Sequence, residues 1–380
     1  MAKLQTTKIT EGDSCFSVPK QSFSDPHHCP VFYNPEMQFN RDLSTIFLKT
    51  CIEHCKITKP RLFDGYTGTG IRGIRYLKES DIDTAVLCDA GDASIPFIKK
   101  NILLNKVSKR AAVMHMDVNQ ALSTSPLFDV IEMDPFGSPI QNIDSAFRRG
   151  KKKFILSLTF TDLANLCGGH KDACKRFYNA QSINCAFCHE LAMRIIIGHV
   201  ANIASLHEFG VTPLVSWYQG HYVKTFLLCE SGALKADANF DKLGYAWLCK
   251  KCGNRGTSVE MLSKCDCGEK LNVAGPLWLD KFSSKEVLKK AAVNLAEQKF
   301  YAEAQQAKLV KFMGLLFEES EAPLFYSLSE LCSQAKLHVP KLVDFMNKLQ
   351  SNGFEVTATH FAPGCFKTNA TIKNILALLK

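Results

Sequence analysis

The sequence predicts an α/β protein that begins with a doubly wound parallel sheet and continues into a smaller α+β part. Between residues 60 and 160, short apolar runs alternate with helical stretches, which is typical of parallel strands joined by crossover helices. A glycine-rich segment follows the first apolar run, and a cysteine-rich insert occupies residues 245–270. At 380 residues the chain has room for two or three domains. We expect one domain over residues 1–230, including an N-terminal arm, and a second over residues 231–380.

Composition narrows the class of protein. The chain is 46% hydrophobic and 22% charged, which excludes a mainly disordered or fibrous protein. Its apolar runs are far shorter than the roughly 18 residues of a membrane span. A net charge of +9 favours a polyanionic partner. Without an apolar secretory signal at the N-terminus, the 16 cysteines indicate reduced thiols in an intracellular protein, cytoplasmic or nuclear. Nothing in the sequence indicates an obligate protein partner.

The expected elements follow in chain order. Four prolines within the first 40 residues predict an extended arm. The expected strands are Arg61–Phe63, Ala85–Cys88, Ala112–His115, Phe128–Met133, Phe154–Leu158 and, farther on, Trp217–Glu230. The expected helices are Arg41–Cys55, Ile71–Ser80, Ser94–Asn105 and Asn184–Phe209. Ser283 and Glu286 form a capping box that predicts a long helix to about Phe317. Two helices and a hairpin over Tyr326–Lys380 indicate a winged-helix-like tail.

A nucleotide-cofactor motif follows the first predicted strand. It reads Asp64-Gly-Tyr-Thr-Gly68-Thr-Gly70-Ile-Arg72-Gly73 and opens the next helix. Glycines let a ligand approach the backbone, and the helix N-terminus adds N–H donors. Asp89, at the end of the next strand, is placed to accept ribose hydroxyls. The motif leaves NAD and S-adenosylmethionine open, as well as a tight turn with no ligand, although Asp64 favours S-adenosylmethionine.

A second motif, Asp134-Pro135-Phe136-Gly137, follows the fourth predicted strand. Ligands of such sheets bind beyond these strand ends. The chemistry suits an exocyclic amine on a base, which is a poor nucleophile because its lone pair is delocalised into the ring. The Asp134 carboxylate and the Pro135 carbonyl oxygen can accept its two N–H groups, and Phe136 offers a face for stacking. The alternative is a plain Pro-Gly turn.

With these motifs the sequence resembles the tRNA guanine-N2 dimethyltransferases that modify guanine 26, nearly from end to end. Near the N-terminus the resemblance rests on Val31-Phe-Tyr-Asn-Pro and Asn40-Arg41-Asp42-Leu43. Around the two motifs it rests on Gly70-Ile-Arg72-Gly73 and Asp134-Pro-Phe-Gly-Ser-Pro139. Beyond them it rests on Thr159-Phe-Thr-Asp162, Leu166-Cys-Gly168, Cys174-Lys-Arg-Phe-Tyr178, His189-Glu190, His221-Tyr222, Gly275-Pro-Leu-Trp278 and Thr359-His360-Phe361. The chain departs from the family's usual pattern at Leu163-Ala-Asn165 and at Thr357-Ala358.

The resemblance implies a class I (Rossmann-like) methyltransferase domain and a smaller C-terminal domain that helps to hold tRNA. It implies S-adenosylmethionine-dependent methylation of guanine 26 at N2, twice, giving N2,N2-dimethylguanosine. Asp134 would be the catalytic carboxylate, with Pro135 and Phe136 beside the base. The cofactor contacts would be Arg41, Asp64, Gly68, Gly70, Arg72, Asp89, Asp117 and Val118.

A third motif has the spacing of a zinc knuckle. Cys249 and Cys252 form one pair, and Cys265 and Cys267 form the other, each pair being followed by a glycine. Four thiolates suit a closed, structural zinc site. The second pair is C-x-C rather than the commoner C-x2-C, so core or surface thiols are the alternative.

Two other groups of residues have simpler interpretations. Cys167, Cys174, Cys185, Cys188 and His189 are expected to pack in the core, because free cysteine is among the most buried residue types. The basic run Arg148–Lys153 is either a solvated surface or a phosphate contact.

Two rivals to the methyltransferase hypothesis remain. An NAD-dependent oxidoreductase would use the glycine motif, but it leaves the Asp134 motif unexplained. A non-catalytic tRNA-binding protein would have no need of either motif.

Overall fold

The computed structural model describes residues 4–26 and 28–380, so the first three residues of the stretch examined for a secretory signal lie outside it. The chain divides into two compact units. Unit 1 comprises Met1–Phe160, Thr225–Ser231 and Ser283–Val310, and unit 2 comprises Thr161–Lys224, Gly232–Phe282 and Lys311–Lys380. Unit 1 thus includes a segment well beyond residue 230, and the division into domains 1–230 and 231–380 stays a prediction. Among the described residues no helix is long and apolar enough to cross a membrane.

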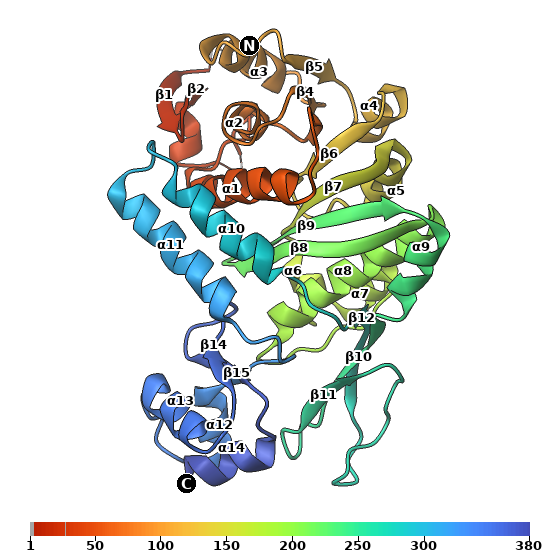
Figure 1. Cartoon of the computed structure of the whole chain (residues 1–380), viewed down its shortest axis with the longest axis vertical. Coiled ribbons are helices and arrows are strands. Elements are labelled where there is room, and N and C mark those ends of the chain that lie inside the picture. The colour runs from red at the N-terminus through yellow and green to blue at the C-terminus, as the bar shows by residue number, and fades with distance from the viewer. Residues whose placement is uncertain (1–3, 27) are drawn as a thin grey trace. The chain divides into compact units, whose positions relative to one another are not determined.

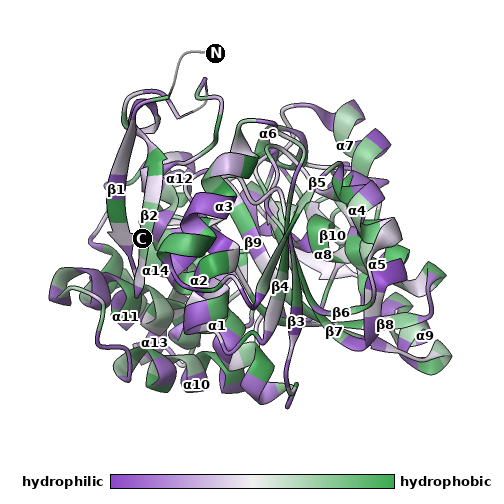
Figure 2. Ribbon diagram, turned by 90° about the horizontal axis from the view of Figure 1, so that it is seen from above, coloured by the Kyte–Doolittle hydropathy of each residue, from purple (hydrophilic) through white to green (hydrophobic). Residues whose placement is uncertain are grey.

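Unit 1 is built on a parallel sheet (Figure 1). Its first strands are β3 (Arg61–Gly65), β4 (Thr84–Asp89), β5 (Ala111–His115), β6 (Phe128–Met133) and β7 (Gly150–Phe160). They stand in the order β5-β4-β3-β6-β7, every neighbouring pair is parallel, and β9 (Tyr222–Ser231) follows β7. These strands are mostly apolar because both faces are covered, and Figure 2 shows the hydrophobic colour along β3 and β4.

Helices cover both faces of this sheet. They are α1 (Gln38–His54), α2 (Ile71–Glu79), α3 (Ser94–Leu104), α4 (Val118–Thr124), α5 (Ile140–Arg149) and α10 (Lys285–Ala296). Figure 2 shows α1, α2 and α3 on one face and α4 and α5 on the other. This is the predicted doubly wound arrangement, and it brings the ends of β3, β4 and β6 to one edge.

The prediction of an extended N-terminal arm is wrong. Strands β1 (Thr6–Glu11) and β2 (Ser14–Pro19) form an antiparallel hairpin, followed by the 3-10 helices η1 (Lys20–Phe23) and η2 (Pro35–Met37). Phe16 and Val18 are completely buried, and the Ser17 N–H donates to Asn101 Oδ1 at 2.7 Å. Pro19 ends a strand rather than interrupting one, a position that proline tolerates.

The long helix predicted after Ser283 is two helices. The N-cap is Ser284, whose hydroxyl accepts the Val287 N–H, and α10 ends at Ala296 before α11 (Glu303–Glu318) begins. Between them the buried Tyr301 hydroxyl accepts a hydrogen bond from Arg75 at 3.3 Å. This long-range contact is made by the segment in which the helix is interrupted.

Unit 2 combines helices with two small three-stranded sheets and with β8, which is the last strand of the seven-stranded sheet β5-β4-β3-β6-β7-β9-β8. The helices are α6 (Leu163–Leu166), α7 (Lys171–Tyr178), α8 (Cys188–Leu206), α9 (Ala233–Phe240), α12 (Leu328–Ala335), α13 (Leu342–Ser351) and α14 (Ile372–Leu379). The strands are β8 (Phe209–Gln219), β10 (Leu243–Leu248), β11 (Arg255–Ser258), β12 (Asn272–Trp278), β13 (Tyr326–Ser327), β14 (Val356–Ala358) and β15 (Cys365–Thr368). Strand orders are β11-β10-β12 and β13-β15-β14. The second sheet with α12 and α13 is the predicted winged-helix-like tail, to which α14 adds an unexpected last helix.

Candidate active site

The loop between β3 and α2 is the predicted glycine motif. The Thr67 N–H donates to the Cys88 carbonyl oxygen at 3.1 Å, which ties the loop to β4. Gly68 has a φ of +57°, and a Cβ there would lie 2.9 Å from the Phe32 carbonyl oxygen. Only glycine fits this position. Gly70, with a φ of +81°, then leads into α2, so the loop backbone and the helix N-terminus face the same end of the sheet.

Two acidic residues follow the neighbouring strands. Asp89, at the end of β4, accepts hydrogen bonds from the N–H groups of Gly68 at 2.8 Å and Gly91 at 2.9 Å. A carboxylate has about four lone-pair sites, so Asp89 retains acceptor capacity for a ligand hydroxyl. Asp117, after β5, is exposed and caps α4, and Val118 beside it is buried.

Asp64 lies under the glycine loop and is only 1% exposed. The Thr67 hydroxyl donates to its carboxylate at 2.5 Å. Burial raises the pKa of Asp64 to about 7, although the Thr67 hydrogen bond opposes the shift. A cation that reached this carboxylate would therefore favour its ionised form at neutral pH.

Asp134 directly follows β6, and its carboxylate forms an ion pair with Arg72 of α2. Arg72 also lies 3.9 Å from Glu132 Oε1 and donates to Ser44 Oγ at 3.1 Å. Burial alone would lower the pKa of Arg72, but the charges of Asp134 and Glu132 raise it well above its ordinary value. The guanidinium thus stays cationic and favours the ionised form of Asp134.

Glu132 is a site residue that the sequence interpretation missed. It is completely buried in β6 and accepts a hydrogen bond from the Tyr76 hydroxyl at 2.9 Å. Tyr76, Glu132, Arg72 and Asp134 form a continuous polar chain. A signal was available, because side chains two apart on a strand share a face, and a carboxylate within an apolar strand needs a buried partner.

Aromatic rings line the cavity that contains Asp134 or lie next to it. Phe136 is 65% exposed, and the Phe32 ring packs edge-on against it at a centroid distance of 4.5 Å. Tyr66 is also exposed, and its hydroxyl donates to Asn142 Oδ1 at 2.7 Å. Such exposed rings offer stacking surfaces for a planar base.

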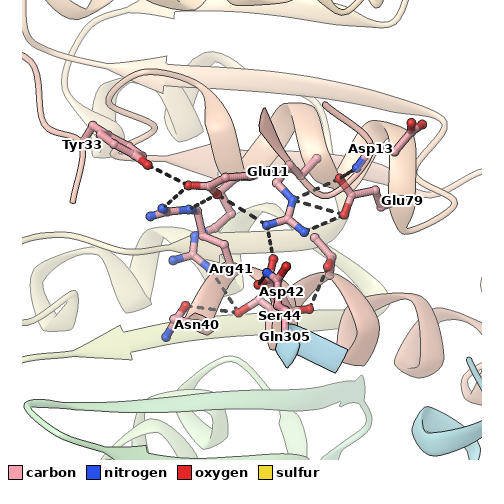
Figure 3. A network of polar contacts seen from close by, with 12 residues as sticks. Glu11, Asp13, Tyr33, Asn40, Arg41, Asp42, Ser44, Glu79 and Gln305 are labelled. Carbon is pink, nitrogen blue, oxygen red and sulfur yellow. Dashed lines mark hydrogen bonds and ion pairs between the residues drawn. The ribbon is translucent and has the colours of Figure 1, made fainter. Parts of the chain in front are cut away.

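Arg41 of α1 is held by the N-terminal hairpin (Figure 3). Its Nε and Nη2 donate to the two Glu11 carboxylate oxygens at 2.7 and 2.6 Å, and Nη2 also donates to the Asn34 carbonyl oxygen at 3.1 Å. Burial raises the pKa of Glu11, but the charges of Arg41 and Arg75, with hydrogen bonds from Arg41 and Tyr33, together outweigh it and the net shift is downward. Nothing in the sequence relates residues so far apart, so Glu11 was also missed.

One cavity gathers much of the predicted site. Its walls comprise Phe32, Tyr33, Asn34, Arg41, Asp64, Tyr66, Thr67, Gly68, Thr69, Ile71, Arg72 and Asp134. Asp89 adjoins it through the Gly68 N–H, and Phe136 through Phe32. Pro135 is buried in the turn after Asp134, and Asp117 and Val118 lie at a neighbouring strand end outside the walls. The cavity combines fixed cations, buried carboxylates and exposed rings.

Comparison with known proteins explains this combination. The profile of the N2,N2-dimethylguanosine tRNA methyltransferase family matches residues 12–380. The chain belongs to this family. It is 33% identical to the tRNA (guanine(26)-N(2))-dimethyltransferase of Pyrococcus abyssi, covering 99% of this chain and 100% of the relative. It is also 33% identical to that of Methanococcus maripaludis, covering 98% and 97%.

A solved structure supports the fold of this family member. The complex of Trm1 from Pyrococcus horikoshii with S-adenosyl-L-methionine superimposes with a TM-score of 0.88 at 28% identity, covering 98% of this chain and 100% of that one. The predicted α/β methyltransferase fold and the family resemblance are thereby confirmed.

The predicted knuckle cysteines of this family member come together in unit 2. Cys249 Sγ lies 3.6 Å from Cys267 Sγ, and Cys252 Sγ lies 3.6 Å from Cys265 Sγ. All four sulfurs lie within 4.8 Å of one another. The C-x-C spacing of the second pair therefore does not prevent convergence.

The basic run lies at the edge of the sheet away from the cavity. It spans the end of α5 and the start of β7, whereas Asp134 follows the end of β6. Arg148 pairs with Asp144 at 2.7 Å, and Lys151 pairs with Asp129 at 2.8 Å. These local ion pairs favour the interpretation of the basic run as a solvated surface over that of a phosphate contact.

Proposed function

We propose that this chain transfers methyl groups from S-adenosylmethionine to the N2 amine of guanine 26 in tRNA, twice, giving N2,N2-dimethylguanosine. The observation that carries the proposal is the Asp134 carboxylate, paired with Arg72 in the same cavity as the glycine loop. Membership of the family supports it. An oxidoreductase would have no use for that carboxylate, and a mere tRNA-binding protein would not need an intact cofactor loop.

The residues of the cavity fit S-adenosylmethionine. Gly68 leaves space that a Cβ would fill, and Asp89 retains acceptor capacity beside it. Asp64 offers a buried carboxylate for a cationic group, and Arg41 and Arg72 offer guanidiniums for an anionic one. Gly70, Asp117 and Val118 complete the proposed cofactor contacts at the neighbouring strand and helix ends.

The reaction follows from the chain's own groups. S-adenosylmethionine supplies an electrophilic methyl group. Asp134 and the Pro135 carbonyl oxygen accept the N–H groups of the guanine amine and turn its lone pair away from the ring. Phe136 and Phe32 hold the base by stacking. The amine loses its proton after it attacks, and Asp134 is the group placed to accept it.

The substrate sets the remaining requirements. A base inside folded tRNA must leave its stack to reach the cavity. The net charge of +9 suits a polyanion, whose phosphates supply sequence-independent affinity. A tRNA substrate also fits the expected intracellular location.

The product assay tests this proposal directly. We expect purified protein with labelled S-adenosylmethionine to convert guanosine 26 of a tRNA transcript into N2-methyl- and then N2,N2-dimethylguanosine, identified by nucleoside mass spectrometry. The matched control is the same transcript with adenosine at position 26, which has no N2 amine. Equal labelling of both transcripts would contradict the assignment.

The raised pKa of Asp64 predicts that cofactor affinity depends on pH. Its pKa is about 7 in the free protein, and a cationic group beside it favours the ionised form. Binding should therefore release a proton, and affinity for S-adenosylhomocysteine should rise with pH up to about 7, by at most tenfold per unit. Calorimetry in buffers of different ionisation enthalpy measures that proton. Asp64→Asn should abolish the release, whereas Asp83→Asn, at an exposed loop residue, should retain it; equal release in all three proteins would contradict the role.

We also propose that Cys249, Cys252, Cys265 and Cys267 bind one structural zinc ion. Four converging sulfurs are the donor set of closed zinc sites. Zinc analysis of protein purified without added metal should show that Cys267→Ser lowers the content by about one ion per chain. Cys29→Ser, a half-buried cysteine outside the knuckle, should leave it unchanged. Identical zinc content in the Cys267→Ser and wild-type proteins would count against the site.

A further inference from the structure

A second group of metal-ligand side chains lies at the start of α8. Cys167, Cys188 and His189 each offer a sulfur or nitrogen atom, and these atoms lie within 4.8 Å of one another. Cys167 directly follows α6, and the other two residues are the first of α8. Two helix ends of unit 2 therefore converge on one point, far along the chain from the knuckle cysteines.

These cysteines differ from the packed cysteines of the same chain. Cys51, Cys174 and Cys229 are completely buried, as inert cysteines usually are. Cys167 and Cys188 are only half-buried, as is His189. Cys174 is completely buried, as the expectation of core packing requires, whereas the three residues of this group are only partly buried.

The backbone around the group is closely fitted. Gly168 has a φ of +88° and lies close to the segment that precedes α8. A Cβ on Gly168 would be 2.4 Å from the Asn184 backbone nitrogen. The Ser182 hydroxyl donates to the Asn165 carbonyl oxygen at 3.0 Å and fixes the same two segments. The chain therefore holds Cys167 against the start of α8 before any ligand binds.

The side chains of the group are also oriented. Cys167 and Cys188 share a hydrogen bond between their side chains. The His189 ring is stacked on Tyr218, with a centroid distance of 4.1 Å and an interplanar angle of 13°. Ligands whose orientation is fixed by their neighbours bind a metal with little reorganisation.

We propose that Cys167, Cys188 and His189 bind one zinc ion, with water in the fourth position. Thiolate and imidazole are zinc ligands, whereas magnesium and calcium take oxygen. Tetrahedral zinc with bonds of about 2.0–2.3 Å holds its ligand atoms roughly 3.3–3.8 Å apart. Small side-chain rotations bring atoms within 4.8 Å of one another to that spacing. Each thiol loses its proton as its sulfur binds.

A zinc ion bound here connects two elements of unit 2. It joins α6 to the first turn of α8, and the next residue of α8 is Glu190. Glu190 is completely buried, pairs with Arg194 at 2.8 Å and accepts the Leu324 N–H at 3.1 Å. Zinc at this point would hold the first turn of α8 in place and, with it, the buried Glu190 and its contacts to Arg194 and Leu324.

Zinc stoichiometry in the full chain tests the site without any assay of activity. Because zinc is added back, a knuckle with three thiolates would fill again, so the background is the Cys265→Ser/Cys267→Ser double variant, which keeps only two knuckle cysteines, reconstituted with zinc under reducing conditions and desalted. We expect about one zinc ion per chain there, and its loss in both Cys167→Ser and Cys188→Ser made on that background. Cys185→Ser, a half-buried cysteine of the same segment outside the group, should retain it.

Cobalt gives a second readout on the same proteins. Tetrahedral thiolate coordination should give d–d and sulfur-to-cobalt absorption in the Cys265→Ser/Cys267→Ser background that disappears with Cys188→Ser. Zinc content unchanged by Cys167→Ser and Cys188→Ser would overturn the proposal. So would a metal-free protein in which these two cysteines form a disulfide, lighter by two hydrogen masses.

Discussion

The substitution Asp134→Asn should lower methyl transfer to tRNA by roughly 10- to 150-fold or more, because a charge-assisted hydrogen bond contributes about 1.5–3 kcal/mol. An amide keeps the shape of the side chain, but its NH2 group points a donor at the donor groups of the guanine amine. It also cannot take the proton that the amine loses. Single-turnover transfer from labelled S-adenosylmethionine measures the step itself.

Two controls separate chemistry from disruption of the site. Affinity for S-adenosylhomocysteine should change little in Asp134→Asn, because Arg72 still lies beside the completely buried Glu132. Asp144→Asn removes an exposed carboxylate of α5 that pairs with Arg148 and should leave the rate near that of the wild type. Wild-type turnover in Asp134→Asn would exclude the proposed role of this carboxylate.

The edge of the sheet that carries the site was predictable from local sequence. Asp64, Asp89 and Asp134 each end or follow a short apolar run, and the carboxyl ends of parallel strands meet at one edge. The strands themselves were predictable because a sheet covered on both faces needs nearly continuous apolar side chains. Strand order and the glycine loop then place these carboxylates near one another.

The long-range contacts around the site were not predictable in the same way. Glu11 reaches Arg41 from a hairpin that the prolines of the N-terminal segment obscured. Phe32 meets Phe136, and Tyr301 meets Arg75, through packing between distant segments. Such contacts depend on tertiary structure, and neither periodicity nor spacing encodes them. The same reason explains why a helix predicted as one became two.

A second large effect is expected in the tail of unit 2. Lys367 of β15 is only 1% exposed, and its Nζ lies 3.0 Å from Glu319 Oε1 and 3.3 Å from Glu190 Oε2. Burial raises the pKa of both glutamates, but neighbouring charges that include Lys367 outweigh it and lower both. Lys367 thus forms ion pairs with two buried carboxylates.

The substitution Lys367→Met should destabilise the protein by about 3–5 kcal/mol at pH 7, as removing one partner of a buried ion pair does. Methionine fills similar space, so the loss reflects charge rather than volume. Urea unfolding followed by circular dichroism measures it. Lys373→Met, on the exposed surface of α14, is the matched control and should change stability by no more than about 0.5 kcal/mol.

The pH dependence distinguishes the electrostatic cause from lost packing. In the wild type the glutamate pKa values lie below their ordinary range, so both carboxylates stay ionised at pH 5 and at pH 7. Lys367 is one of the charges that lower both pKa values, so in Lys367→Met these values rise, and the native variant binds more protons near pH 5 than the wild type does. The difference from the wild type should therefore be smaller at pH 5. Lys367→Arg restores the charge and should recover part of the loss at pH 7; an equal deficit at both pH values, with no recovery by arginine, would assign the effect to packing.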